Sequence, residues 1–196
     1  MFLNKYFPAI VAIVALAPTG VQAAPSESPE TTLNRGLAEL LSLVKGRNNT
    51  DAVELAKRVR PTLEKFFNFE SLTRKALGAS WKDLTPTQQN QAVKLFSEII
   101  IRSYTSKFDP SSQIEINFSK ALDLGPGRKE VPATAKYQGT MVAVSYRVES
   151  APDGWRVYDV IIEGISLASN YRAQFEAIRQ KGGGDALIRS MEEKLK

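Results

Sequence analysis

Apolar residues recur every three or four positions through the first half of the chain, and this spacing is typical of amphipathic helices. It predicts four helices, which cover roughly residues 33–44, 51–60, 69–77 and 86–108. None of the four is apolar all round. We therefore expect each helix to bury one face and to leave the other in water.

Proline, glycine and hydroxyl residues mark the ends of these helices. Pro61 is expected to interrupt or restart the second helix, and Gly78 to end the third. The start of the fourth is the clearest, because Thr85 can cap it, Pro86 occupies its first position and Gln88 completes a capping box.

The period then changes from helical spacing to strict alternation, which is typical of strands. Alternating segments cover residues 113–118, 131–138 and 142–149, and a fourth run, 155–162, is apolar on both faces except for Asp159. A strand with two apolar faces needs cover on both sides. Glycine-containing turns separate the strands, and such short links favour an antiparallel meander.

Two helices are expected to close the chain, the first over residues 167–180 and the second from Ala186 to Leu195, with Asp185 as its cap. The order of elements is therefore helices, then strands, then helices. This order predicts an α+β fold in which helices lie on one side of a four-stranded antiparallel sheet.

The first 23 residues have the organisation of a secretory signal peptide. Lys5 gives the positive start, residues 9–17 form a short apolar core, and Val21-Gln22-Ala23 fits a cleavage site. The apolar core is far shorter than the ~20 residues that span a bilayer, and the chain has no cysteine for a lipid anchor. We expect a free periplasmic protein with a flexible tail over residues 24–30 and one domain over residues 31–196.

The composition excludes most catalytic chemistry. The 196 residues include no histidine and no cysteine, so a Ser-His-Asp triad, a thiolate nucleophile and a His/Cys metal site are all excluded. Asp159 and Glu163 would lie about 13 Å apart along a strand, beyond the ~5–9.5 Å that separates paired catalytic carboxylates. We therefore expect no enzyme, no cofactor and no metal.

The charge of the chain is mildly basic and dispersed. The net charge is +5, and removal of the leader takes away one of the 26 Lys+Arg and none of the 21 Asp+Glu, which leaves +4. No basic cluster is interleaved with aromatic residues, so a nucleic-acid partner is not expected.

Two blocks of sequence resemble a known family. They are WRVYDVIIEGISLASNYRAQF at residues 155–175 and FFNFESLTRKALGASWKDL at residues 66–84, the second followed by Thr85-Pro86-x-Gln88. Both are similar to the MlaC and toluene-tolerance family of periplasmic phospholipid-binding proteins, and the resemblance extends over the chain after the leader. It implies a cone built on a strongly curved sheet, as in NTF2-like folds, with an additional N-terminal helical part.

The resemblance also implies a function. Members of this family are auxiliary components of ABC transporters that maintain outer-membrane lipid asymmetry. It implies a monomeric lipid-transport protein whose cargo is a phospholipid, with the tails between sheet and helices and the headgroup outside. The implied partners are an inner-membrane MCE-domain protein with its ABC transporter and an outer-membrane lipoprotein–porin complex. Three alternatives remain: a carrier of another amphiphile such as a hopanoid or fatty acid, a small NTF2-like enzyme, and a structural adaptor with a filled core.

The apolar rows of the long helix and the strands fit either a filled core or the wall of a cavity, because both need the same residue types. The resemblance favours the wall of a cavity over a filled core. The predicted lipid-binding residues are Phe96, Ile99, Ile100, Tyr104, Ile116, Val144, Tyr146, Val160, Ile162, Ile165 and Phe175.

Three charged residues lie beside these rows. Asp159 fits either a headgroup-orienting position or a buried carboxylate held by backbone N–H groups or by an arginine, and an unpaired buried charge is excluded by its cost. Arg172 is expected to pair with Asp159 or Glu163, the alternative being a contact with phosphate. Gly164 and Ser166 are expected to form the corner that joins the last strand to its helix.

Overall fold

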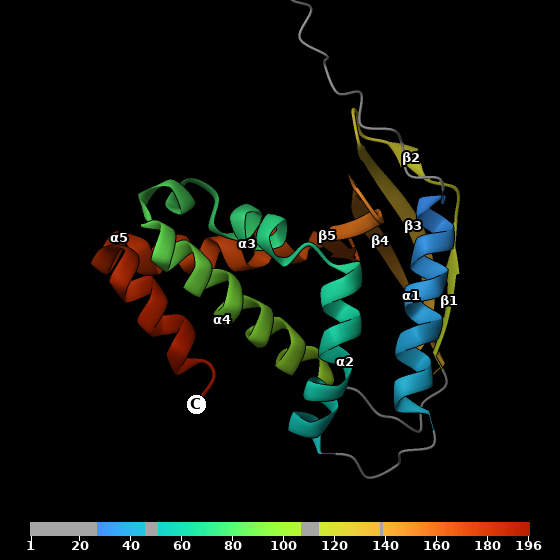
Figure 1. Cartoon of the computed structure of the whole chain (residues 1–196), viewed down its shortest axis with the longest axis horizontal. Coiled ribbons are helices and arrows are strands. Elements are labelled where there is room, and N and C mark those ends of the chain that lie inside the picture. Colours follow the sequence, from blue (N-terminus) through green and yellow to red (C-terminus); the bar gives the residue numbers. More distant parts are fainter. Residues whose placement is uncertain (1–26, 46–50, 107–113, 138) are drawn as a thin grey trace, which may run out of the picture.

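The computed structural model describes residues 27–45, 51–106, 114–137 and 139–196 (Figure 1). The predicted signal peptide, residues 1–23, lies outside the described residues. None of the helices in the described ranges has the length and hydropathy of a membrane span. The helices of the described part are α1 (Pro29–Val44), α2 (Ala52–Phe66), α3 (Phe69–Leu77), the 3₁₀ helix η1 (Gly78–Asp83), α4 (Pro86–Thr105) and α5 (Leu167–Glu193).

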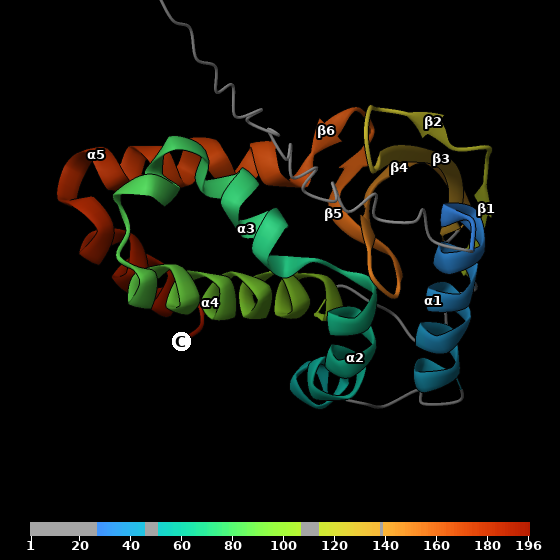
Figure 2. The same ribbon diagram turned by 45° about the horizontal axis from the view of Figure 1, so that its top comes forward.

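The strands form one antiparallel sheet in the order β1-β3-β4-β5-β6, with the short β2 paired to β3. Four of them are the predicted strands, and β2 and β6, of two residues each, are too short to show alternation. Figure 2 shows that the sheet curls strongly, with α3, α4 and α5 gathered beyond one end of it. The predicted α+β fold is confirmed. The strands are β1 (Ile114–Phe118), β2 (Leu122–Asp123), β3 (Arg128–Tyr137), β4 (Thr140–Ala151), β5 (Gly154–Ile162) and β6 (Ile165–Ser166).

The buried apolar residues form two separate clusters. The larger, here the helical core, joins α2, α3, α4 and α5. The smaller, here the sheet core, lies where the first half of α1 meets β3, β4 and β5, and it consists of Leu33, Val131, Val148, Trp155 and Val157. The interior is therefore divided into two packed regions with a space between them.

Three of the predicted helix-end signals are present, whereas the Asp185 carboxylate, predicted as a cap, accepts a hydrogen bond from Gln88. Thr85 and Gln88 form the capping box of α4, Gly78 ends α3 with a positive φ of 56°, and the Ser166 side chain accepts a hydrogen bond from the Ser169 N–H at the start of α5. These signals are local, which is why the sequence alone located them.

Two predicted boundaries are wrong. Helix α1 begins at Pro29, capped by Ser28, so the end of the predicted flexible tail is helical and only residues 24–26 of it lie outside the described residues. Helix α2 continues through Pro61 to Phe66. Val59 and Leu63, on either side of Pro61, both pack against the helical core, and this packing outweighs the lost hydrogen bond.

The two predicted C-terminal helices form a single element that is bent at a pair of glycines. Gly182 and Gly183 depart from helical backbone angles, and Gly183 has a φ of +65°, which glycine adopts without steric cost. The Asp185 carboxylate accepts a hydrogen bond from Gln88 of α4 at 2.7 Å. The bend therefore lets the end of α5 fold back along α4.

Candidate ligand cavity

An apolar cavity of about 360 Å³ lies between the sheet and the helices α1, α2 and α4, in the space between the two cores. Every side chain that lines it is hydrocarbon or aromatic except that of Thr105. The lining residues are Leu37, Leu40, Leu41, Val44, Leu55, Val59, Leu63, Phe67, Phe69, Ile100, Ile101, Tyr104, Thr105, Ile114, Ile116, Val144, Tyr146, Val160, Ile162 and Leu167.

Strand alternation builds the sheet side of this cavity. Val144 and Tyr146 lie two positions apart on β4 and therefore share a face. Their partners across the ladder to β5 are Ile162 and Val160, so the four side chains form a continuous apolar surface. Ile116 of β1 extends it beyond β3.

Tyr146 is a partly buried polar group in the wall. Burial raises the pKa of its phenol to about 12, and its ring packs edge-on against Phe118 at 5.6 Å between centroids. Tyr104 is 47% exposed. Burial first and the neighbouring Tyr171 second raise its pKa. Neither phenol provides a charge at neutral pH, so the cavity suits a hydrocarbon ligand.

Seven of the eleven predicted lipid-binding residues line the cavity, and their contact with lipid stays a prediction. They are Ile100, Tyr104, Ile116, Val144, Tyr146, Val160 and Ile162.

The other four lie off the cavity. Phe96 and Phe175 are completely buried and meet edge to face at 5.3 Å between centroids, inside the helical core. Ile99 is buried in the same core, on the side of α4 that faces α5. Ile165 is 65% exposed on the edge strand β6. Because α4 is covered on more than one side, its apolar residues do not all face the same neighbour.

The sequence prediction missed the contribution of the N-terminal helices. Leu37, Leu40, Leu41 and Val44 of α1 line the cavity, together with Leu55, Val59 and Leu63 of α2. Their helical spacing was visible in the sequence. What the spacing cannot show is which surface an amphipathic helix covers.

Asp159 is held inside the protein as a structural carboxylate. It is fully buried and accepts hydrogen bonds from the Val160 and Ala168 N–H groups at 3.0 and 3.1 Å and from the Ser166 hydroxyl at 2.7 Å. Lys75 of α3 pairs with it at 3.1 Å, and an Arg147 nitrogen lies at 3.9 Å. Its oxygens are thus engaged by α3, β4 and α5.

Arg172 does not form the predicted pair with Asp159 or Glu163. Its guanidinium donates two hydrogen bonds to the backbone carbonyl of Lys75. The Glu163 carboxylate accepts from the Ala143 N–H at 2.6 Å, at a corner where its own φ is +49°. Arg172 thus joins α5 to the backbone of α3, and Glu163 fixes the backbone at the end of β5.

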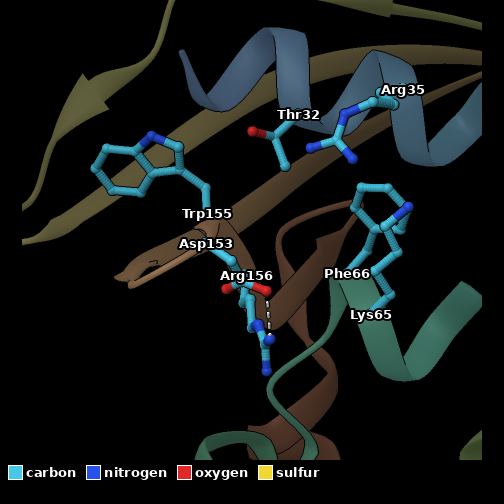
Figure 3. A pocket seen from close by; sticks show the side chains of 7 residues that line it. All are labelled: Thr32, Arg35, Lys65, Phe66, Asp153, Trp155 and Arg156. Atoms are coloured by element: carbon cyan, nitrogen blue, oxygen red, sulfur yellow. Dashed lines mark hydrogen bonds and ion pairs between the residues drawn. The ribbon is translucent and has the colours of Figure 1, made fainter. Parts of the chain in front are cut away.

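Two further pockets are polar. One of about 280 Å³ lies between α4 and α5, where Arg102 pairs with Glu98 and donates to the Leu195 carbonyl. The other, about 30 Å³, lies at the junction of α1, α2 and β5 (Figure 3). In the part of the chain that the structure describes, no group of three or more acidic, histidine or cysteine side chains is arranged to hold a metal ion.

This geometry defines a class of protein: an α+β protein whose curved sheet and helices form an apolar cavity suited to a hydrophobic ligand. The chain belongs to the MlaC protein family, whose model matches residues 34–193. It is 22% identical over 199 residues to the intermembrane phospholipid transport system binding protein MlaC of Haemophilus influenzae, covering 97% of this chain and 93% of that protein.

A solved structure is similar as well. The phospholipid-binding protein from Ralstonia solanacearum, determined in complex with a phospholipid, matches with a TM-score of 0.78 and 26% sequence identity. The match covers 86% of this chain and 97% of that one. The family prediction and the predicted fold class are both confirmed.

Proposed function

We propose that this protein is a soluble periplasmic carrier that binds the acyl chains of a phospholipid in the apolar cavity and shuttles the lipid between outer-membrane and inner-membrane complexes. The cavity between the two cores is the observation that carries the proposal. The H. influenzae relative is named as the binding protein of an intermembrane phospholipid transport system, and the R. solanacearum protein binds a phospholipid.

The energetics of lipid transfer explain why such a cavity is needed. The two tails of a phospholipid contain roughly 30 methylene or methyl groups, and at ~0.8 kcal/mol each their exposure to water would cost about 25 kcal/mol. A carrier has to offer an environment about as apolar as a bilayer. It has to bind no more tightly than that, because a tighter site would not release its cargo.

The remaining parts of the proposal concern location and partners. Residues 1–23 act as a signal peptide that directs the chain to the periplasm. The partners are an MCE-domain protein with its ABC transporter at the inner membrane and a lipoprotein–porin complex at the outer membrane. The sequence has neither a P-loop nor a GxGxxG motif, so the energy for transport comes from the transporter, and the cargo is the only bound molecule.

The alternatives are less well supported. A filled-core adaptor has no use for a cavity of this volume. A small enzyme needs free acid–base groups in its cavity. The two carboxylates considered for that role, Asp159 and Glu163, instead bind backbone N–H groups outside the lining.

The test is native mass spectrometry of protein freshly isolated from cells, with organic extraction to identify the released lipid. A charged side chain in the wall should prevent hydrocarbon binding, so Val144→Glu and Ile162→Glu are expected to carry no phospholipid. Met141→Glu is the matched control, because Met141 is 59% exposed on the same strand as Val144 and points to the opposite face.

Circular dichroism has to show that the three variants are folded. Phospholipid on the wild type and on Met141→Glu, and none on the two wall variants, supports the proposal. Equal lipid on folded wall variants, or no lipid on the wild type, contradicts it.

A further inference from the structure

The volume of the cavity sets how many acyl chains it can hold. An apolar cavity of about 150 Å³ in another protein binds benzene, which has six carbons. At the same ratio of volume to carbon, about 360 Å³ accommodates roughly 14 carbons. That is about one acyl chain, whereas a diacyl phospholipid has two. To hold both chains inside, the cavity would need about twice this volume.

Most of the cavity wall is held firmly in place. The sheet side is held by the ladders between β3, β4 and β5, the second of which contains one register shift at Arg147 and Val148. Helix α2 contributes Leu55 and Val59 to the helical core and is joined to α4 by the Arg60–Glu98 ion pair. Helix α4 contributes several residues to the same core. Only α1 has none of its buried residues in the helical core.

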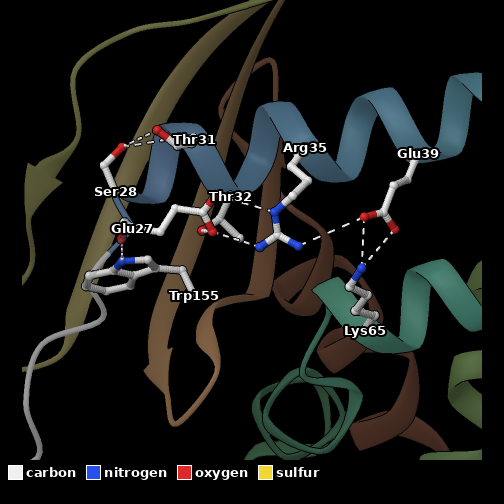
Figure 4. A network of polar contacts seen from close by, with 8 residues as sticks. All are labelled: Glu27, Ser28, Thr31, Thr32, Arg35, Glu39, Lys65 and Trp155. Carbon is white, nitrogen blue, oxygen red and sulfur yellow. Dashed lines mark hydrogen bonds and ion pairs between the residues drawn. The ribbon is translucent and has the colours of Figure 1, made fainter.

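The first half of α1 is tied to the sheet by a set of contacts, here the α1 anchor (Figure 4). The Trp155 indole donates to the Glu27 carbonyl at 3.0 Å, and the Glu27 carboxylate binds both Thr32 and Arg35. Leu33 lies in the sheet core. The Glu30 carboxylate accepts from the Ala121 N–H at 2.6 Å, so this end of α1 is fixed at several points.

Helix α1 approaches α2 closely at Gly36. A Cβ at Gly36 would lie 3.0 Å from the Phe66 ring, so glycine permits the contact. Arg35 and Lys65 both lie over that ring, at 5.1 and 5.0 Å from its centroid. These contacts surround the 30 Å³ pocket in Figure 3, which is too small for an organic ligand.

The second half of α1 has fewer polar contacts than the first half, and its partly buried Leu40 and Val44 pack against the helical core. Its side chains that face the cavity, Leu37, Leu40, Leu41 and Val44, are all only partly buried. Within the described residues, the pair between Glu39 and Lys65, at 2.8 Å, is the only ion pair or hydrogen bond that joins this half to another element. Both partners are substantially exposed, at 36% and 50%.

We propose that the cavity takes a diacyl phospholipid in two stages: one chain fills the space as it stands, and the second enters only when the half of α1 beyond Gly36 swings outward about the α1 anchor. The inference rests on the proposed function and adds that single-chain and two-chain lipids make different demands on α1. A single-chain lipid needs no movement of α1, whereas a two-chain lipid does.

The natural chain has no cysteine, so α1 can be fixed at a chosen point. Glu39→Cys with Lys65→Cys, bridged by a short bismaleimide, pins the second half of α1 to α2. Glu30→Cys with Ala121→Cys, bridged in the same way, fixes the α1 anchor and is the matched control. Each delipidated protein is then titrated with myristoyl lysophosphatidylcholine and with dimyristoyl phosphatidylcholine.

The bridged Glu39/Lys65 variant should bind the lysolipid within about twofold of the unbridged protein and the diacyl lipid at least tenfold more weakly, while the bridged control binds both normally. Undiminished binding of the diacyl lipid, or equal loss of both lipids, would overturn the inference. Failure of the unbridged wild type to bind any lipid would instead refute the proposed function, and the inference with it.

Discussion

Replacement of Asp159 by asparagine should destabilise the protein strongly. The substitution keeps the shape of the side chain and removes its charge. Lys75, whose side chain is only 25% exposed, then loses the carboxylate that lies 3.1 Å from its ammonium group. The new amide also replaces one of the two carboxylate oxygens by an NH₂ group, so either the Ser166 hydroxyl or the Ala168 N–H, which now donate to different oxygens, loses its acceptor.

The size of the effect follows from the burial of Asp159. Removal of one member of a buried ion pair costs about 3–5 kcal/mol, because the other charge is left without compensation. The exposure of Lys75 places the expected value near 3 kcal/mol. Small domains have unfolding free energies of about 5–15 kcal/mol, so the variant should still fold at room temperature.

Urea denaturation followed by circular dichroism gives the measurement. With a slope of about 2 kcal/mol per molar urea, the midpoint should fall by roughly 1.5 M at an unchanged slope. Glu70→Gln is the control, because the Glu70–Arg74 pair lies on the exposed surface of α3 at 3.8 Å, and it should cost below about 1 kcal/mol. If Asp159→Asn costs no more than Glu70→Gln, then the buried carboxylate is not what fixes the corner between β5 and α5.

Three further predictions concern the stability of the fold. Phe175→Ala should cost about 3–5 kcal/mol in urea denaturation yet leave co-purified lipid unchanged, because Phe175 lies in the helical core away from the cavity; loss of lipid from a folded variant would contradict this. For Tyr146 the raised pKa means that the unfolded chain ionises first, so wild-type stability should be unaffected below about pH 10 and should fall by roughly 1.4 kcal/mol per pH unit up to about pH 12. Tyr146→Phe should flatten that decline, and an unchanged slope would count against burial as the cause. Thr85→Ala removes the cap of α4 and should cost about 1 kcal/mol, measured in the same way, with an effect below about 0.3 kcal/mol being incompatible with a working cap.

The features that the sequence predicted are those encoded over a few neighbouring residues. The capping box at Thr85, the helix end at Gly78 and the strands β3 and β4, predicted from alternation, each depend on local spacing, and each is present. The predicted interruption at Pro61 is absent from the structure. The free-energy cost of a proline inside a helix is outweighed there by the packing of α2 against residues distant in the sequence.

The candidate site was predictable only in part, for a physical reason. A cavity wall and a solid core require the same apolar residues at the same spacing, and what separates them is where the facing elements stop. Phe96 and Ile100 lie four positions apart on α4 and are equally apolar, yet the first packs against Phe175 and the second against the cavity. Similarly, Lys75 rather than Arg172 pairs with Asp159, because the position of α3 brings Lys75 beside the carboxylate.

The division of the interior into two clusters makes the stability of the protein depend on whether the cavity is occupied. Most domains fill their own interior, whereas this one leaves an apolar cavity between its two clusters that a bound ligand has to fill. A guest that binds only the native chain raises its melting temperature by mass action. Preparations of the same protein should therefore melt over a range of temperatures set by occupancy, and the vacant molecules should be the ones that proteases cut first.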